Sequence, residues 1–153
     1  MSLEIRLIDE FVALDLEVDS GVEALKFIAG LGENLNLVRP TWLAAVTRRE
    51  IEFPTGLPTL IPVAIPHTDS VHVIADGVGF FKLVNPVDFG EMGSLDAKIQ
   101  VQMILPLLIT NPAEQVELLM AVIGALQKSD FLEALAASGT KEEVIAIFRA
   151  EGL

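Results

Sequence analysis

The spacing of the apolar residues changes at Ser20, and this change limits what the chain can fold into. Between residues 11 and 19, leucine and valine alternate with aspartate and glutamate, which is the period of a half-buried β-strand. From Ser20 onward the apolar residues recur at helical intervals, and Ser20 with Glu23 forms a capping box. Gly30 or Gly32 lies near the expected end of this helix. A strand followed at once by a helix indicates helices packed against a sheet.

The rest of the chain continues this mixture of helix and strand signals. We expect a second helix over residues 41–51, two or three strands within 71–83 split by Asp76 and Gly77, a polar loop over 85–96 and a buried strand over 98–108. Capping residues predict three further helices, over 111–127, 129–137 and 140–152. This order predicts one α/β domain, residues 1–153, with a three-layer α/β/α sandwich around a mixed β-sheet.

Composition excludes several classes of protein. The chain has 153 residues, 52% of them hydrophobic, and its mean hydropathy is +0.54, yet no apolar run reaches the roughly 18 residues of a membrane span. The N-terminus is acidic and lacks the basic start of a signal peptide. Cysteine is absent, which excludes disulfides and thiolate metal sites. We therefore expect a cytoplasmic protein.

The net charge of −12 argues against nucleic acid as a partner, because the neutralisation of phosphates requires a basic face. The charge has two interpretations. It keeps a strongly apolar chain in solution, or it steers the chain toward a basic protein partner.

His67 stands in an apolar stretch, Ile61–Asp69, that has prolines at positions 62 and 66. Prolines fix φ and favour extended backbone in the residue before them, so we expect His67 at the end of a stiff strand. Imidazole carries both nucleophilic and proton-transfer chemistry near neutral pH. A lone histidine in apolar surroundings is as often a buried structural residue as an active one. The Thr-Asp that follows favours a turn, and therefore exposure of the ring.

Other catalytic devices have little support in the sequence. His72 is five residues from His67 and would point to the opposite face of a strand, so a two-histidine metal site is not expected. Neither a serine-hydrolase elbow nor a phosphate loop occurs, and the glycines of Gly77–Gly79 lie between β-rich runs rather than before a helix. What remains is His67 as a nucleophile. Arg48 and Arg49 upstream would bind an anion, or would only compensate charge at a helix C-terminus.

Four short segments together resemble a known family. They are Arg49-Glu50, Thr55-Gly56, Val63–His67 and Val84–Phe89. Together they are similar to the signature of the enzyme IIA domains of the bacterial phosphoenolpyruvate-dependent sugar phosphotransferase system (PTS), fructose/mannitol class. The resemblance covers essentially the whole chain and implies a single EIIA type-2 domain over residues 1–153. The last of the four segments is also similar to galactitol-type proteins.

The resemblance implies a phosphotransferase that carries phosphoryl groups in sugar or polyol uptake. The carrier protein HPr would phosphorylate His67 on Nε2, and the group would pass to a cysteine of a IIB domain that serves a membrane IIC permease. Nδ1 of His67 would donate a hydrogen bond that fixes the tautomer. Arg49 would balance the phosphoryl charge, and Thr55 would bond near it. No metal and no cofactor is implied, and an acidic surface would speed the encounter with a basic HPr.

Two positions depart from the family pattern. Many members have a second histidine at the start of the helix after the last strand, where this chain has Gln115. Glutamine can donate a hydrogen bond to a phosphoryl group but cannot titrate. The glycine that the family places before Ile-Ala is Pro62 or Val63 here, which changes the expected shape of the loop.

The resemblance also leaves two alternatives open. One is a regulatory IIA-type module, as in the nitrogen-related branch of the family, in which phosphorylation of His67 controls protein partners. The other is a non-catalytic domain in which His67 is simply buried.

Overall fold

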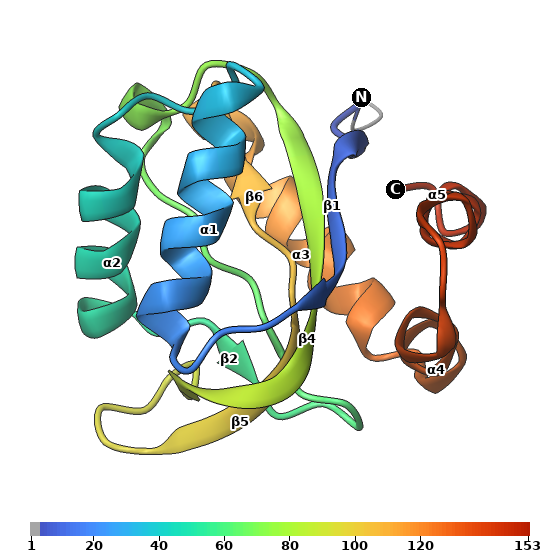
Figure 1. Ribbon diagram of the computed structural model, residues 1–153. Coiled ribbons are helices and arrows are strands. Elements are labelled where there is room, and N and C mark those ends of the chain that lie inside the picture. Colours follow the sequence, from blue (N-terminus) through green and yellow to red (C-terminus); the bar gives the residue numbers. More distant parts are fainter. Residues whose placement is uncertain (1–3) are drawn as a thin grey trace.

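The computed structural model describes residues 4–153 as a central β-sheet with helices on both faces (Figure 1). The strands are β1 (Leu7–Leu16), β2 (Gly56–Leu57), β3 (Val63–Ala64), β4 (Gly77–Gly90), β5 (Lys98–Ile104) and β6 (Leu107–Leu108). The helices are α1 (Gly21–Asn34), α2 (Trp42–Glu52), α3 (Gln115–Leu126), α4 (Ser129–Ala137) and α5 (Lys141–Ala150), with short 3₁₀ turns η1 (Ser70–His72) and η2 (Pro112–Glu114). The predicted α/β sandwich is confirmed.

The sheet combines parallel and antiparallel pairs in the order β1-β4-β5-β3-β2. The pairs β1–β4 and β3–β5 are parallel, whereas β4–β5 and β2–β3 are antiparallel. The short strand β6 pairs with the start of β4. The sheet is therefore mixed, as predicted, and β4 is its longest strand.

Two hydrophobic cores lie on opposite faces of this sheet. Helices α1 and α2 cover one face, and α3, α4 and α5 cover the other (Figure 1). Neighbouring residues of β4 supply both cores, because successive side chains of a strand point to opposite faces. Phe80 meets the ring of Phe148 edge to face at 5.9 Å in one core, and Phe81 meets Phe11 at 5.1 Å in the other.

The starts of α1 and α5 are where the sequence predicts them, whereas the helix predicted from residue 111 begins with the turn η2 and becomes α3 only at Gln115. The Ser20 hydroxyl accepts the N–H of Glu23 at 3.1 Å, and Thr140 caps α5 in the same way. Helix α1 ends at Asn34, two residues after Gly32, so a glycine does lie near its end as expected. Gly32 lies inside the helix against Val38, so its missing side chain serves close packing rather than termination.

The predicted strands and loops between residues 71 and 108 need correction. Residues 70–72 form η1 instead of a strand, and β4 runs without a break through the first part of the predicted loop. Asn85 and Pro86 lie where the register of β4 against β5 shifts, and such an irregularity tolerates a proline in a strand. The predicted strand 98–108 is divided into β5 and β6 around Leu105 and Pro106.

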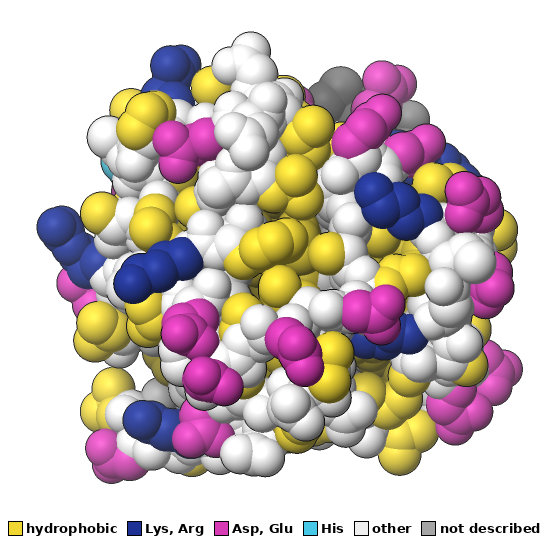
Figure 2. Space-filling model, in the orientation of Figure 1, with side chains coloured by type: hydrophobic (Ala, Val, Ile, Leu, Met, Phe, Trp, Pro, Cys, Tyr) yellow, Lys and Arg dark blue, Asp and Glu magenta, His cyan; other side chains and the backbone are white. Residues whose placement is uncertain are grey.

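The surface does not concentrate the negative charge on the face shown in Figure 2. There the Asp and Glu side chains are scattered among basic, apolar and neutral groups, and apolar side chains gather near the centre. Within residues 4–153, no helix is both long and apolar enough to cross a membrane.

Gly79 and Gly30 make a matched test of this packing. A Cβ at Gly79 would lie 2.5 Å from the ring of Phe11 and 2.9 Å from Pro106, whereas a Cβ at Gly30 would meet nothing within 4 Å. Gly79→Ala should therefore lower the free energy of unfolding by about 1–3 kcal/mol. Gly30→Ala, inside α1, should raise it by about 0.5–1 kcal/mol. Urea unfolding of both variants checks the sign, and equal effects would contradict the packing described.

Candidate functional site

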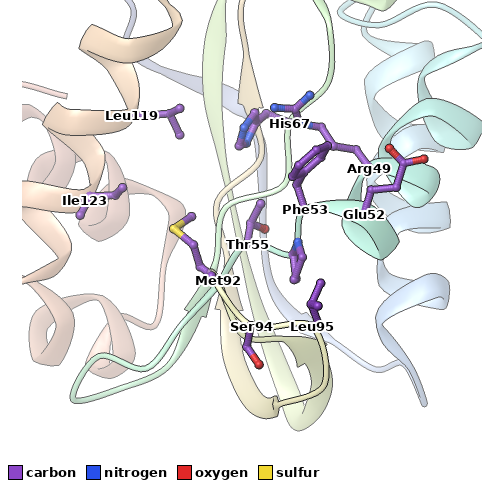
Figure 3. Close-up of a pocket in the computed structure, with 12 residues that line it drawn as sticks. Arg49, Glu52, Phe53, Thr55, His67, Met92, Ser94, Leu95, Leu119 and Ile123 are labelled. Carbon is purple, nitrogen blue, oxygen red and sulfur yellow. The ribbon is translucent and has the colours of Figure 1, made fainter.

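A cavity of about 480 Å³ brings together segments that are far apart in the sequence (Figure 3). The end of α2 and the chain just after it form one wall, the loop between β4 and β5 forms another, and α3 forms a third. His67 reaches this cavity from the segment that follows β3. The lining residues are Arg49, Glu52, Phe53, Pro54, Thr55, His67, Met92, Gly93, Ser94, Leu95, Leu119 and Ile123.

Backbone hydrogen bonds fix the segment that carries His67. The carbonyls of Pro62, Ala64 and Pro66 accept N–H groups from Gln102, Leu105 and Leu107, at 3.0, 2.9 and 3.0 Å. On the other side, the N–H of Ile65 donates to the Thr55 carbonyl at 3.3 Å. The segment is thus held from both sides just before His67, as expected for a residue at a strand end.

His67 is only 5% exposed, so the predicted exposure of the ring is wrong. The chain becomes exposed only at Asp69, because Thr68 is also buried, so the turn expected after His67 does not expose the ring. The Nδ1 atom lies 2.8 Å from the carbonyl oxygen of Ile65. A carbonyl can only accept, so Nδ1 carries the proton and Nε2 keeps its lone pair.

Burial is the main cause that lowers the pKa of His67 below its usual value of 6.5. The hydrogen bond to Ile65 acts in the opposite direction, and the positive charge of Arg49 lowers the pKa further. The ring is therefore neutral at pH 7, and a neutral imidazole with a free Nε2 lone pair is a nucleophile.

Arg49 supplies a positive charge beside this ring. Its guanidinium lies over the Phe53 ring at 5.6 Å, and its Nη1 is 3.7 Å from Oδ1 of the exposed Asp69. Its Nε is buried and makes no hydrogen bond within residues 4–153. Arg49 thus has donor capacity that an anion in the cavity could use. The neighbouring Arg48 is exposed and does not line the cavity.

Glu50 is a site residue whose environment sequence reasoning missed. Its carboxyl group accepts the Thr55 N–H at 3.1 Å and the Thr55 hydroxyl at 2.5 Å. Burial raises the pKa of Glu50, while these two bonds and Arg49 act against that rise. Thr55 lines the cavity, and the predicted bond to a phosphoryl group, which stays a prediction, would require its hydroxyl to leave Glu50. The only sequence signal for this contact was that Glu50 and Thr55 lie five residues apart, on either side of the end of a predicted helix.

Gln115 is the first residue of α3 and does not line the cavity. Residues four apart on a helix share one face, so Gln115 precedes Leu119 and Ile123 on the face that does line it. Helix α3 therefore contributes an apolar wall to the cavity. Contact between Gln115 and a phosphoryl group stays a prediction.

The second histidine is elsewhere. Nδ1 of His72 lies 2.8 Å from the Thr41 hydroxyl, and the residue belongs to η1 rather than to a strand. In the part of the chain that the structure describes, no group of three or more His, Asp and Glu side chains could hold a metal ion.

Comparisons with known proteins point to one family. The family described as "Phosphoenolpyruvate-dependent sugar phosphotransferase system, EIIA 2" matches residues 7–151. The galactitol-specific EIIA components of Escherichia coli K12 and of Escherichia coli O157:H7 are 33% identical over 100 residues. That match covers 65% of this chain and 66% of those relatives, just under two thirds of their length.

Solved structures share the fold. Enzyme IIAMTL of Escherichia coli, in its complex with phosphorylated enzyme IIBMTL, superposes with a TM-score of 0.78 at 22% identity, over 94% of this chain and 97% of that one. The nitrogen regulatory protein IIA-Ntr of Neisseria meningitidis gives a TM-score of 0.73 at 26% identity, over 93% of this chain and 95% of that one.

The buried neutral state of His67 makes stability depend on pH. In the unfolded chain this ring titrates near 6.5, and in the folded chain it titrates lower, so the unfolded state binds more protons between the two pKa values. The stability that comes from the neutral ring is present above pH 6.5 and is lost as the pH falls.

We therefore expect acidification from about pH 7.5 to about pH 5.5 to destabilise the wild type more than His67→Gln. Urea unfolding at both pH values gives the difference in free energy of unfolding between the wild type and His67→Gln. Both proteins contain Glu50, so its contribution cancels in this difference. An unchanged difference would contradict the assignment.

Proposed function

This chain belongs to the EIIA 2 family of the phosphoenolpyruvate-dependent sugar phosphotransferase system, and from that premise we propose that it carries a phosphoryl group on His67. HPr donates the group, and a IIB component accepts it for a membrane IIC permease. The observation that carries the proposal is the bond from His67 Nδ1 to Ile65, which leaves the Nε2 lone pair free on a ring that lines the cavity together with Arg49.

The first transfer forms one bond and breaks one. The Nε2 lone pair attacks the phosphorus of phosphohistidine on HPr, an N–P bond forms, and the electron pair of the old N–P bond returns to the donor imidazole. The proton on Nδ1 of His67 stays in place, and the Ile65 carbonyl stabilises the positive charge that develops on the ring. Such a transfer depends on positioning and charge balance rather than on a covalent role for the protein.

Arg49 balances the charge of the phosphoryl oxygens. Its contact with Asp69 is long, at 3.7 Å, so the guanidinium can turn toward the cavity without the loss of a short ion pair. The buried Nε adds a donor that finds no other partner in residues 4–153.

The second transfer moves the phosphoryl group from His67 to the IIB component. The thiolate of a IIB cysteine attacks the phosphorus, an S–P bond forms, and the electron pair of the N–P bond returns to His67 Nε2. The ring is then neutral again and ready for the next cycle. The apolar residues of the cavity wall keep water away from the phosphorylated nitrogen.

The system that we propose is of the galactitol type, on the basis of the 33% identity to galactitol-specific EIIA components. The competing role is a regulatory IIA, which the 26% identity to a nitrogen regulatory IIA-Ntr favours. The test is phosphoryl transfer from the labelled chain to a galactitol IIB and to a mannitol IIB. Faster transfer to the galactitol IIB supports the galactitol type. Transfer to neither supports the regulatory role.

Phosphorylation tests the carrier itself. Incubation with phosphoenolpyruvate, enzyme I and HPr should label the wild type and His72→Ala, but not His67→Ala. The label should be labile in acid and stable in alkali, as expected for phosphohistidine. Equal labelling of the two alanine variants would contradict the proposal.

Arg49→Gln should slow transfer from HPr on the order of 100-fold, because the developing phosphoryl charge loses its counter-charge. Stopped reactions with labelled HPr measure the rate, and Arg48→Gln, which removes an exposed neighbouring charge, is the control. The thermal midpoint of Arg49→Gln should stay close to the wild type. A collapse of that midpoint would instead make Arg49 a structural residue.

A further inference from the structure

The half-buried carboxyl group of Glu50 takes no part in the transfers above, yet hydrogen bonds connect it to His67. Glu50 accepts two bonds from Thr55, the Thr55 carbonyl accepts the N–H of Ile65 at 3.3 Å, and the Ile65 carbonyl accepts Nδ1–H of His67 at 2.8 Å. We propose that Glu50 is a positioning residue that holds His67 in the Nδ1–H tautomer and in the orientation for phosphorylation. The catalytic part of this inference rests on the proposed function.

The hydrogen bonds between Glu50 and Thr55 hold the start of strand β2. Thr55 directly precedes β2, whose Gly56 and Leu57 pair with Ala64 and Val63 of β3. A Cβ at Gly56 would lie 2.6 Å from the carbonyl of Gly90 and 3.1 Å from the Ile99 side chain, so the backbone approaches its neighbours closely here. The bonds from Thr55 to Glu50 are the side-chain anchor just before β2, beside the backbone bond from the N–H of Met92 to the Gly56 carbonyl at 2.8 Å.

The second link determines the acceptor of the imidazole. Ile65 is held on one side by the Thr55 carbonyl and on the other through its neighbour Ala64, which bonds to Leu105. Its own carbonyl points at Nδ1 of His67. A shift of Thr55 would move Ile65, and the ring would lose the single acceptor that fixes its tautomer.

The partial burial of Glu50 costs free energy, which is unexpected for a residue that serves only to stabilise the fold. Burial raises the pKa of Glu50, and no salt bridge joins its carboxyl group to another residue between 4 and 153. Partial withdrawal of a carboxyl group from water without an ion pair is unfavourable unless its hydrogen bonds compensate. Both of its oxygens accept hydrogen bonds from Thr55, so the carboxyl group holds the residue that precedes β2.

The test separates positioning from simple support of the fold. In the full chain labelled with ¹⁵N, long-range ¹H–¹⁵N correlations report the tautomer of His67 at pH 7.5 without any phosphorylation. Glu50→Gln keeps one acceptor, and Thr55→Val keeps the shape of the side chain but removes its hydroxyl donor. Both should give a mixture of His67 tautomers, and Thr55→Ser should hold the Nδ1–H form better than Thr55→Val.

Kinetics of transfer from HPr provide the second measurement. Both Glu50→Gln and Thr55→Val should lower kcat by roughly tenfold while KM for phospho-HPr stays the same, because orientation and not docking is lost. Glu133→Gln removes an equal charge from the exposed face of α4 and should change neither measurement.

The outcomes are distinct. The inference is overturned if both variants fold and keep the wild-type tautomer and kcat. If Glu50→Gln does not fold, Thr55→Val decides by the same criteria. If the wild type takes no label on His67, the proposed function fails, and the tautomer measurement still decides whether Glu50 positions the ring.

Discussion

The carbonyls of Pro62, Ala64 and Pro66 accept hydrogen bonds from the adjacent chain, and the site depends on this ladder. A proline has no N–H, so it can join such a ladder only as an acceptor. The two prolines therefore limit β3 to Val63 and Ala64 and release the chain from the sheet directly afterwards. His67 is placed where regular pairing stops but the backbone is still fixed.

Burial then determines the chemistry at that point. Withdrawal from water keeps His67 neutral beside the permanently charged Arg49, so the site holds a nucleophile and a cation instead of two repelling cations. The same withdrawal from water raises the pKa of the carboxyl group of Glu50, which Thr55 compensates. Burial thus shifts the pKa values of the ring and of the carboxyl group in opposite directions, and each group keeps a hydrogen bond that acts against its shift.

The sequence was most informative where one local interaction decides the structure. The capping box at Ser20 predicted the start of α1, and the paired segments around Arg49, Thr55 and His67 do meet at one cavity. Local patterns failed where tertiary pairing decides. The polar residues after Val84 indicated a loop, but β5 pairs with β4 on both sides of the irregularity. The burial of His67 and the bonds of Glu50 depend on strands and helices whose contacts no local pattern contains.

The bond from the N–H of Leu7 to the carbonyl of Leu153, at 2.9 Å, has a consequence for the order of synthesis. Strand β1 is made first, but its parallel partner β4 follows only after both α1 and α2, and Leu153 follows α5. Parallel pairing over such separations is slow to form. During synthesis, β1 therefore keeps an apolar face uncovered until α1, α2 and β4 have been made, and the turn after α5 is made later still.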